Sequence, residues 1–286
     1  IRWTTVISVI ALGCFLVREL TAHQPIVDLR VLGDRNFSVG TVITTLYGIV
    51  LYGITSMLPL FLQTLMGYSA LDSGLAVSPR GFGSMTSMLV AGTLVNYVDS
   101  RLLLAFGFGV LGTSAVMLSH LNLSIAMTSV IFVNVINGFA TGFIFVPLTT
   151  MTMGKLRKEE IGNAAGIYNL MRNIGGSVGI AGITTFLVRG SQTHQNYLVA
   201  NVTSGGSILT GILRGVESRI FLGGVDTFTA HQKAIGMLYK MVQQQASLLA
   251  YMDNFRTLGF LSFLCIPLAL FFRRVRNIQK HAVGAE

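Results

Sequence analysis

Two arginines lie inside long apolar runs of the sequence, where an ionised side chain is energetically costly. Arg80 directly follows Pro79, and Arg172 is flanked by Asn169 and Asn173 on neighbouring faces of an expected helix. A charge within a membrane helix is by default a functional hypothesis. We therefore predict that these two cations and the two amides line a substrate path. The alternative for each arginine is structural: the cation snorkels to the membrane surface or hydrogen-bonds to carbonyls that a kink frees.

Polar side chains in and just after the apolar run Phe37–Leu62 extend this candidate path. We add Tyr47 and Gln63 to the predicted lining. Threonines of the same run are weaker candidates, because a lone Thr in a membrane helix usually bonds to its own backbone.

The acidic residues lie outside the apolar runs, where neither a membrane-embedded enzyme nor a proton carrier could use them. The chain has eleven, and none falls deep in an apolar run. A proton-coupled transporter needs a protonatable carboxylate or His within the membrane, so any proton relay is expected outside this chain. The runs also contain no cluster typical of a hydrolase or a metal site, and the Gly-rich segments show no phosphate-loop pattern. We predict no catalytic residues, no metal and no cofactor.

The composition shows which elements must position these residues. Hydrophobic residues make up 52% of the 286, and charged residues only 11%, against about 25% in soluble domains. The predicted class is an all-α integral membrane protein. The net charge of +9 would suggest nucleic acid in a soluble chain. Here the basic residues sit between apolar runs, as in cytoplasmic loops of membrane proteins, so no nucleic-acid partner is expected.

Seven apolar runs are long enough to be candidate membrane spans. They cover Ile1–Val17, Phe37–Leu62, Ser73–Val95, Leu102–Leu121, Ser124–Thr150, Asn163–Val188 and Phe255–Phe272. The first is short and follows no initiator Met, so we expect a fragment that begins within a spanning helix. Connections that contain Lys or Arg alternate with connections that contain neither. Because basic loops face the cytoplasm, this places the tail 273–286 in the cytoplasm and the first residues outside.

The long segment Arg189–Asn254 falls on the outer side in this topology. Its part Thr227–Met252 has apolar residues at helical spacing, with Asp226 as the N-cap. Its part Asn201–Gly224 is rich in Gly, Ser and Thr, and we expect it to be mobile. Two interpretations remain open: a cap that rests on the membrane, or a docking surface for a periplasmic partner.

Pairs of glycines four residues apart predict close helix contacts. They are Gly162/Gly166 and Gly175/Gly179 in one run and Gly138/Gly142 in the run before it. We expect tight packing of these helices in the bundle. If the contacts also have a function, the two helices would slide past one another during transport.

Several segments together resemble the EmrB/QacA-type drug/proton antiporters, the 14-span branch of the major facilitator superfamily. They are Pro59–Gln63, Gly67–Gly74, Ser78–Gly81, Gly92–Arg101, Gly162–Gly179 and Gln243–Phe255. The resemblance implies that residues 1–18 are part of an extra linker helix and that residues 36–272 are the C-terminal six-helix bundle, including the outer segment 189–254. It also implies that the proton-carrying acids belong to the N-terminal half.

The same resemblance implies a gate loop and a function. Gly92–Arg101 is similar to the superfamily's cytoplasmic loop motif, with Asn96 where a carboxylate is usual and with Asp99 and Arg101 kept. The implied function is proton-coupled efflux of hydrophobic or amphipathic drugs across the inner membrane. The implied partners are the N-terminal half, a periplasmic adaptor and an outer-membrane channel. The alternatives are a specific-solute transporter of the same superfamily and a non-transporting scaffold or truncated product.

Overall fold

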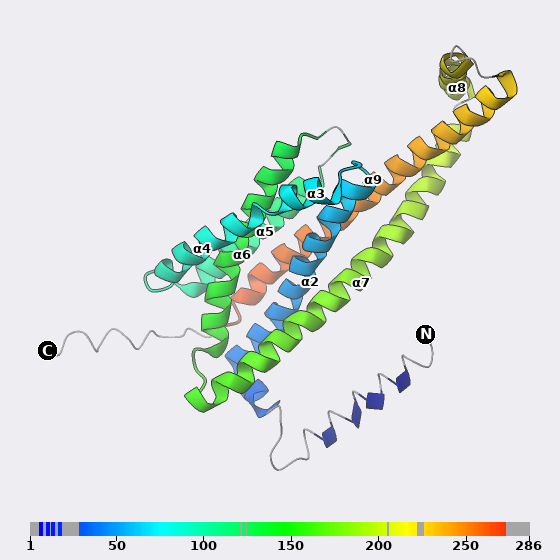
Figure 1. Ribbon diagram of the computed structural model, residues 1–286. Coiled ribbons are helices and arrows are strands. Elements are labelled where there is room, and N and C mark those ends of the chain that lie inside the picture. The colour runs from blue at the N-terminus through cyan, green and yellow to red at the C-terminus, as the bar shows by residue number, and fades with distance from the viewer. Residues whose placement is uncertain are drawn as a thin grey trace.

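The computed structural model in Figure 1 describes residues 29–272 apart from 121, 124, 205 and 222–225, together with residues 6, 7, 10, 11, 13, 14, 17 and 18. The predicted linker helix 1–18, apart from those eight positions, and the tail 273–286 lie outside the described residues. The elements in chain order are η1 (Leu29–Gly33), α2 (Arg35–Thr64), α3 (Ala70–Val77), α4 (Arg80–Leu94), α5 (Ser100–Leu118), α6 (Met127–Met153), α7 (Lys158–Ser204), α8 (Gly206–Phe221) and α9 (Thr227–Ala269). The all-helical class predicted from composition is confirmed for this part of the chain.

The helices pack in two groups, which meet through contacts of α5 with α9 and of α6 with α2. Helix α2 lies against α7 and α9, whereas α4 and α5 lie against α6, and α5 also contacts α9. The main apolar core lies where these groups meet and includes Ile54 and Phe61 of α2, Phe108 of α5, Ile144 of α6 and Phe255 of α9, all of which are buried. This packing holds the central parts of the long helices in fixed register.

The predicted span Ser73–Val95 is two helices and not one. Helix α3 ends at Val77, and α4 begins at Arg80. Pro79 lies between them, and it has no backbone N–H to continue the hydrogen-bond ladder, although Ser78 and Pro79 both keep right-handed helical backbone angles. The break places Arg80 in the first turn of α4.

Two helices are much longer than a membrane span requires. Helix α7 has 47 residues and α9 has 43, against about 20 for a span. Figure 1 shows both continuing past the other helices as an antiparallel pair, with α8 at the far end. We call the part of this pair beyond the bundle, residues 189–254 with α8, the hairpin. Ser191 and Ser247 join its two helices through hydroxyl oxygens 3.1 Å apart.

The hairpin differs from the sequence expectation in two ways. The expected separate helix Thr227–Met252 and span Phe255–Phe272 are parts of one continuous α9. The segment expected to be mobile contains helix α8, which packs on α9. The predicted N-cap is confirmed, because the Asp226 carboxylate accepts a hydrogen bond from the N–H of Thr229 at 3.1 Å.

Within the described residues, α2, α5 and α6 are long and apolar enough to cross a membrane by length and composition. The other predicted spans fall short for visible reasons. Helices α3 and α4 have only 8 and 15 residues. Helices α7 and α9 interrupt their apolar stretches with polar residues such as Arg172, Asp253 and Arg256.

Two of the three glycine pairs pack closely, whereas no described atom lies within 4 Å of a Cβ placed on Gly162 or Gly166. Gly175 and Gly179 of α7 face the backbone of α2, where a Cβ added at Gly179 would lie 2.7 Å from the carbonyl oxygen of Ile49. Gly138 of α6 faces the backbone of α4 at Arg80. Helices α6 and α7 barely touch along their described lengths, so the idea that these stripes let α6 and α7 slide on one another does not fit the structure.

Candidate functional site

A group of buried hydroxyls lies between α2, α6 and α7. Tyr47 of α2 is 1% exposed, and its ring meets that of Phe108 edge-on with centroids 6.2 Å apart. Its hydroxyl oxygen, that of Thr44 and that of Tyr168 are buried with no hydrogen-bond partner among the described residues. An unpaired buried hydroxyl costs about 1–3 kcal/mol, and the longer contacts of Tyr168 with Thr44 and Thr149 and of Tyr47 with Thr141 offset part of this cost.

Hydroxyls of α6 approach the same cluster. Thr141 interacts with Tyr47, and Thr149 interacts with Tyr168. Helix α6 presents both threonines because they lie eight residues apart, about two turns along one face. Each also donates its hydroxyl hydrogen to a carbonyl of its own helix, Thr141 to Asn137 and Thr149 to Phe145.

Arg172 of α7 lies beside these hydroxyls. Its guanidinium donates a hydrogen bond to the Asn169 side-chain oxygen at 2.8 Å, and it lies 5.9 Å from the centroid of the Phe145 ring. Its Nε atom is buried without a hydrogen-bond partner in the described part of the chain. Asn173, the other predicted neighbour, instead accepts from the hydroxyl of Tyr52 of α2 at 3.4 Å. Helix periodicity therefore brings Arg172 and Asn169 together and turns Asn173 towards α2.

The second predicted cation reaches the same region from another helix. Arg80 is half-buried at the start of α4 and donates a hydrogen bond to the hydroxyl of Thr55 in α2. Arg80 and Arg172, about ninety residues apart in sequence, both lie within electrostatic range of Tyr47. We call Thr44, Tyr47, Arg80, Asn169, Arg172 and the hydroxyls around them the arginine cluster.

The remaining predicted residues lie elsewhere. Gln63 is exposed near the end of α2, where its amide donates to the Ser73 hydroxyl of α3 at 3.4 Å.

The predicted gate loop connects α4 and α5. Asp99 caps α5 by accepting from the N–H of Arg101 at 3.1 Å, Asn96 is exposed, and no described atom lies within 4 Å of a Cβ placed on Gly92. These four residues, like Gln63, are therefore not part of the arginine cluster.

Sequence reasoning missed the contributions of Tyr168 and of α6. Tyr168 precedes Arg172 by four residues, a spacing that places both on one helical face, so this signal was available locally. The positions of Thr141, Phe145 and Thr149 depend on how α6 packs near α7 and α2, and no local pattern encodes that.

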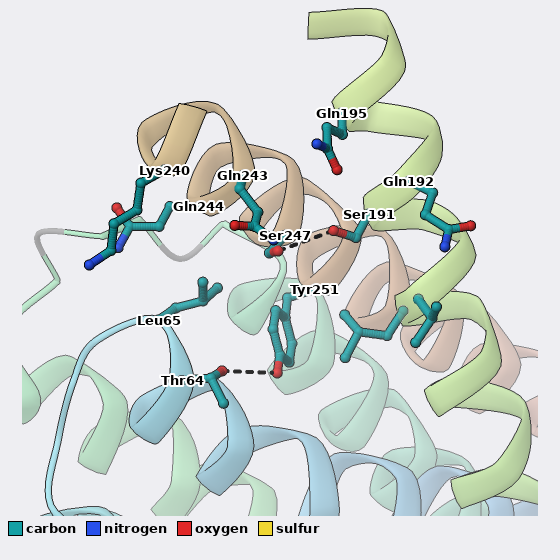
Figure 2. A pocket seen from close by; sticks show the side chains of 12 residues that line it. Thr64, Leu65, Ser191, Gln192, Gln195, Lys240, Gln243, Gln244, Ser247 and Tyr251 are labelled. Carbon is teal, nitrogen blue, oxygen red and sulfur yellow. Dashed lines mark hydrogen bonds between the residues drawn. The ribbon is translucent and has the colours of Figure 1, made fainter. Parts of the chain in front are cut away.

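A separate cavity lies where the hairpin leaves the bundle. It has a volume of about 550 Å³ and lies between the end of α2, α7 and α9 (Figure 2). Four glutamines line it, namely Gln192, Gln195, Gln243 and Gln244, and we call it the amide pocket. In the described residues no group of three His, Cys, Asp or Glu side chains could hold a metal ion.

Comparison with known proteins places this architecture among membrane transporters. The sequence profile of the Major Facilitator Superfamily matches residues 4–180. The fatty acid resistance protein FarB of Neisseria gonorrhoeae is 26% identical over 261 residues, covering 91% of this chain and 50% of the relative. The probable multidrug resistance protein EmrY of Escherichia coli is 33% identical over 199 residues, covering 69% and 39%.

A third relative extends the match to nearly the whole chain. The colistin resistance protein EmrB of Acinetobacter baumannii is 25% identical over 274 residues, covering 96% of this chain and 53% of the relative. The chain thus spans about half the length, or less, of the curated relatives it matches.

Proposed function

Because the chain belongs to the major facilitator superfamily, we propose that it forms the C-terminal half of a proton-coupled efflux transporter for hydrophobic or amphipathic toxic compounds. It is an all-α, multi-pass membrane protein, similar to proteins named for multidrug, fatty acid and colistin resistance. The observation that carries the proposal is the arginine cluster, since intramembrane cations and unpaired hydroxyls between three helices suit a transport path.

The arginine cluster supplies a mixed surface for amphipathic compounds. Arg172 offers a cation and, with Phe145, an aromatic face, while Tyr47 and Thr44 offer hydroxyls that can hydrogen-bond to a ligand. Asn169 orients the guanidinium. In this proposal the second half of the transporter closes the other side of the path, and rocking of the halves exposes the cluster to each side of the membrane in turn.

Proton coupling is assigned to the other half. The acidic residues of this chain lie at the ends of the expected spans or beyond them, and Asp253 pairs with His194 at 2.8 Å within the hairpin. The basic loops support an orientation in the cytoplasmic membrane with residues 273–286 inside. The hairpin then projects outside, where we propose that it contacts a periplasmic adaptor that joins the pump to an outer-membrane channel.

The proposal is tested by dye accumulation in cells that lack other efflux pumps. Cells that express the complete transporter should retain less of several hydrophobic dyes than cells without it, and a proton uncoupler should abolish the difference. Equal accumulation with and without the transporter, across all the dyes, would contradict drug efflux. That result would favour the second candidate, a specific-solute transporter, whose substrate would carry negative charge because the arginine cluster presents two cations.

A further inference from the structure

The groups that line the amide pocket change from apolar to polar along its length, and the pocket is separate from the proposed transport path. On α7 the lining begins with Leu187 and Val188, continues with Ser191 and Gln192, and ends with Gln195 further along the hairpin. Apolar, hydroxyl and amide groups therefore follow one another over about two turns of helix, from the bundle towards the hairpin.

Helix α9 repeats this order in the opposite chain direction. Tyr251 lies nearest the bundle and its hydroxyl is 3.4 Å from that of Thr64 of α2. Ser247 and Gln244 follow, and Lys240 lies furthest along the hairpin. Figure 2 shows Tyr251 and Thr64 at one end of the pocket and Lys240 and the glutamines at the other.

The charge of the pocket is positive. Among the described residues that line it, Lys240 is the charged one. Lys240 can pair with a ligand that carries one negative charge. A zwitterionic ligand would also bring an ammonium group, and the described lining has no carboxylate to pair with it.

This sequence of groups matches a phospholipid standing in one leaflet. Acyl chains would contact Leu187 and Val188, ester carbonyls would accept from Ser191 and the amides, and a phosphate would meet Lys240. We propose that the amide pocket binds a phospholipid with an anionic headgroup from the leaflet on the hairpin side of the membrane. That this is the outer leaflet rests on the orientation given under the proposed function.

The location favours a lipid over a soluble anion. The pocket begins at Thr64 and Leu65, where α2 ends, so its apolar end lies at the level where a membrane gives way to headgroups. The volume of about 550 Å³ exceeds what a phosphate alone requires, and leaves space for the glycerol backbone and the first part of the acyl chains.

The test uses the complete transporter in vesicles of equal parts phosphatidylglycerol and phosphatidylethanolamine. The protein is extracted in mild detergent, and the lipids that remain bound are quantified by mass spectrometry. We expect phosphatidylglycerol to be enriched, and Lys240→Gln to lower the enrichment about fivefold, in line with about 1 kcal/mol for one basic side chain at an anionic surface. Lys240→Arg should retain it.

Lys233→Gln is the matched control. Lys233 is exposed on the same helix, outside the pocket, so its substitution should leave the enrichment unchanged. Equal enrichment in Lys240→Gln and the wild type would overturn the inference. So would displacement of the lipid by glycerol 3-phosphate as effectively as by phosphatidylglycerol, because acyl chains would then contribute nothing. The readout needs no transport, so an inactive transporter that still enriches the lipid would contradict the proposed efflux and leave this site standing.

Discussion

Arg172 is a cation held by neutral neighbours. Its described contacts are the amide oxygen of Asn169 and the face of Phe145, and no ion pair to a carboxylate is described for it. Burial of a charge without a counter-ion is unfavourable, so a half-buried arginine whose described partners are neutral favours contact with a ligand over a purely structural role.

We expect Arg172→Ala in the complete transporter to reduce dye efflux at least about tenfold, corresponding to about 1.4 kcal/mol of lost interaction. Its abundance in the membrane should equal that of the wild type. Arg189→Ala removes an exposed cation from the same helix and should leave efflux intact. Loss of abundance in Arg172→Ala would instead favour the structural interpretation.

Removing the hydroxyl of Tyr47 distinguishes a role of this residue in ligand binding from a role in packing. Tyr47→Phe keeps the ring against Phe108 and removes a buried oxygen whose one described interaction is with Thr141. Because this contact is long and the oxygen makes no closer hydrogen bond, we expect the melting temperature to change little, while efflux of hydrogen-bonding dyes falls. Tyr97→Phe, at an exposed position, should alter neither quantity. A marked drop in melting temperature for Tyr47→Phe would show that its oxygen is satisfied within the fold.

Part of the arginine cluster could be predicted from local spacing. Asn169, Arg172 and Tyr168 share one helix, and their neighbourhood follows from its periodicity. The meeting of Arg80, Tyr47 and Arg172 could not be predicted, because it depends on a helix break at Pro79 and on how three helices pack. Gln63 is polar like the residues of the arginine cluster, but it lies near the end of α2 and hydrogen-bonds to Ser73 of α3.

At the scale of single elements, close packing sets where glycine is required. Gly175 faces the backbone of Thr45 in α2, whereas no described atom lies within 4 Å of a Cβ placed on Gly182. Both are in α7, so both gain about 1 kcal/mol of helix propensity on replacement by Ala. The difference between them therefore isolates the contact with α2.

We expect Gly175→Ala to lower the melting temperature of the purified transporter, because overpacking against backbone costs about 1–3 kcal/mol. Gly182→Ala should be neutral or slightly stabilising. Thermal unfolding of the two variants in the same detergent measures the effect. Equal melting temperatures would mean that α2 and α7 can separate without loss.

The start of α9 depends on a carboxylate. The side-chain and backbone hydrogen bonds from Thr229 hold the pKa of Asp226 below its ordinary value. A lowered carboxyl pKa contributes stability that is fully present above the ordinary pKa and is lost as pH falls through the lowered one. The protection of the first-turn amides of α9 against hydrogen exchange, taken relative to an unstructured chain at the same pH, should therefore be high at neutral pH and lower in strong acid.

Asp226→Ala should lower this protection at neutral pH and remove its dependence on pH. The comparison is with Asp253→Ala, which removes a carboxylate from the middle of the same helix. An unchanged first turn in Asp226→Ala would mean that α8 alone holds this end of α9.

Apolar runs predicted where the helices lie within the bundle, because burial in lipid or protein leaves a direct mark on composition. They did not predict that α7 and α9 continue beyond it. Helix formation needs only compatible backbone and neighbours, so a polar sequence such as Gln243–Gln245 extends a helix once a partner such as α7 lies beside it. The composition of residues 201–224 predicted a mobile segment because Gly and Ser are typical of turns, and it did not predict helix α8, which contacts α9.

At the scale of the whole molecule, the proposed contact between the hairpin and an adaptor can be tested by deletion. Replacing residues 201–224 by a short Gly-Ser linker removes α8 and leaves the bundle helices unchanged. We expect the variant to recover less of the adaptor in co-purification while its own abundance stays normal. Unchanged recovery would place any adaptor contact elsewhere on the transporter.

The length of α7 gives the molecule a mechanical property. A continuous helix of 47 residues is about 70 Å long, and it runs without a described break from the arginine cluster to the hairpin. Such a helix acts as a lever: a tilt of the bundle by about 10° would carry its far end through about 10 Å. Small rotations at the arginine cluster would thus become large displacements at α8, and a fluorophore pair spanning the hairpin and the bundle could follow each transport cycle from outside the membrane.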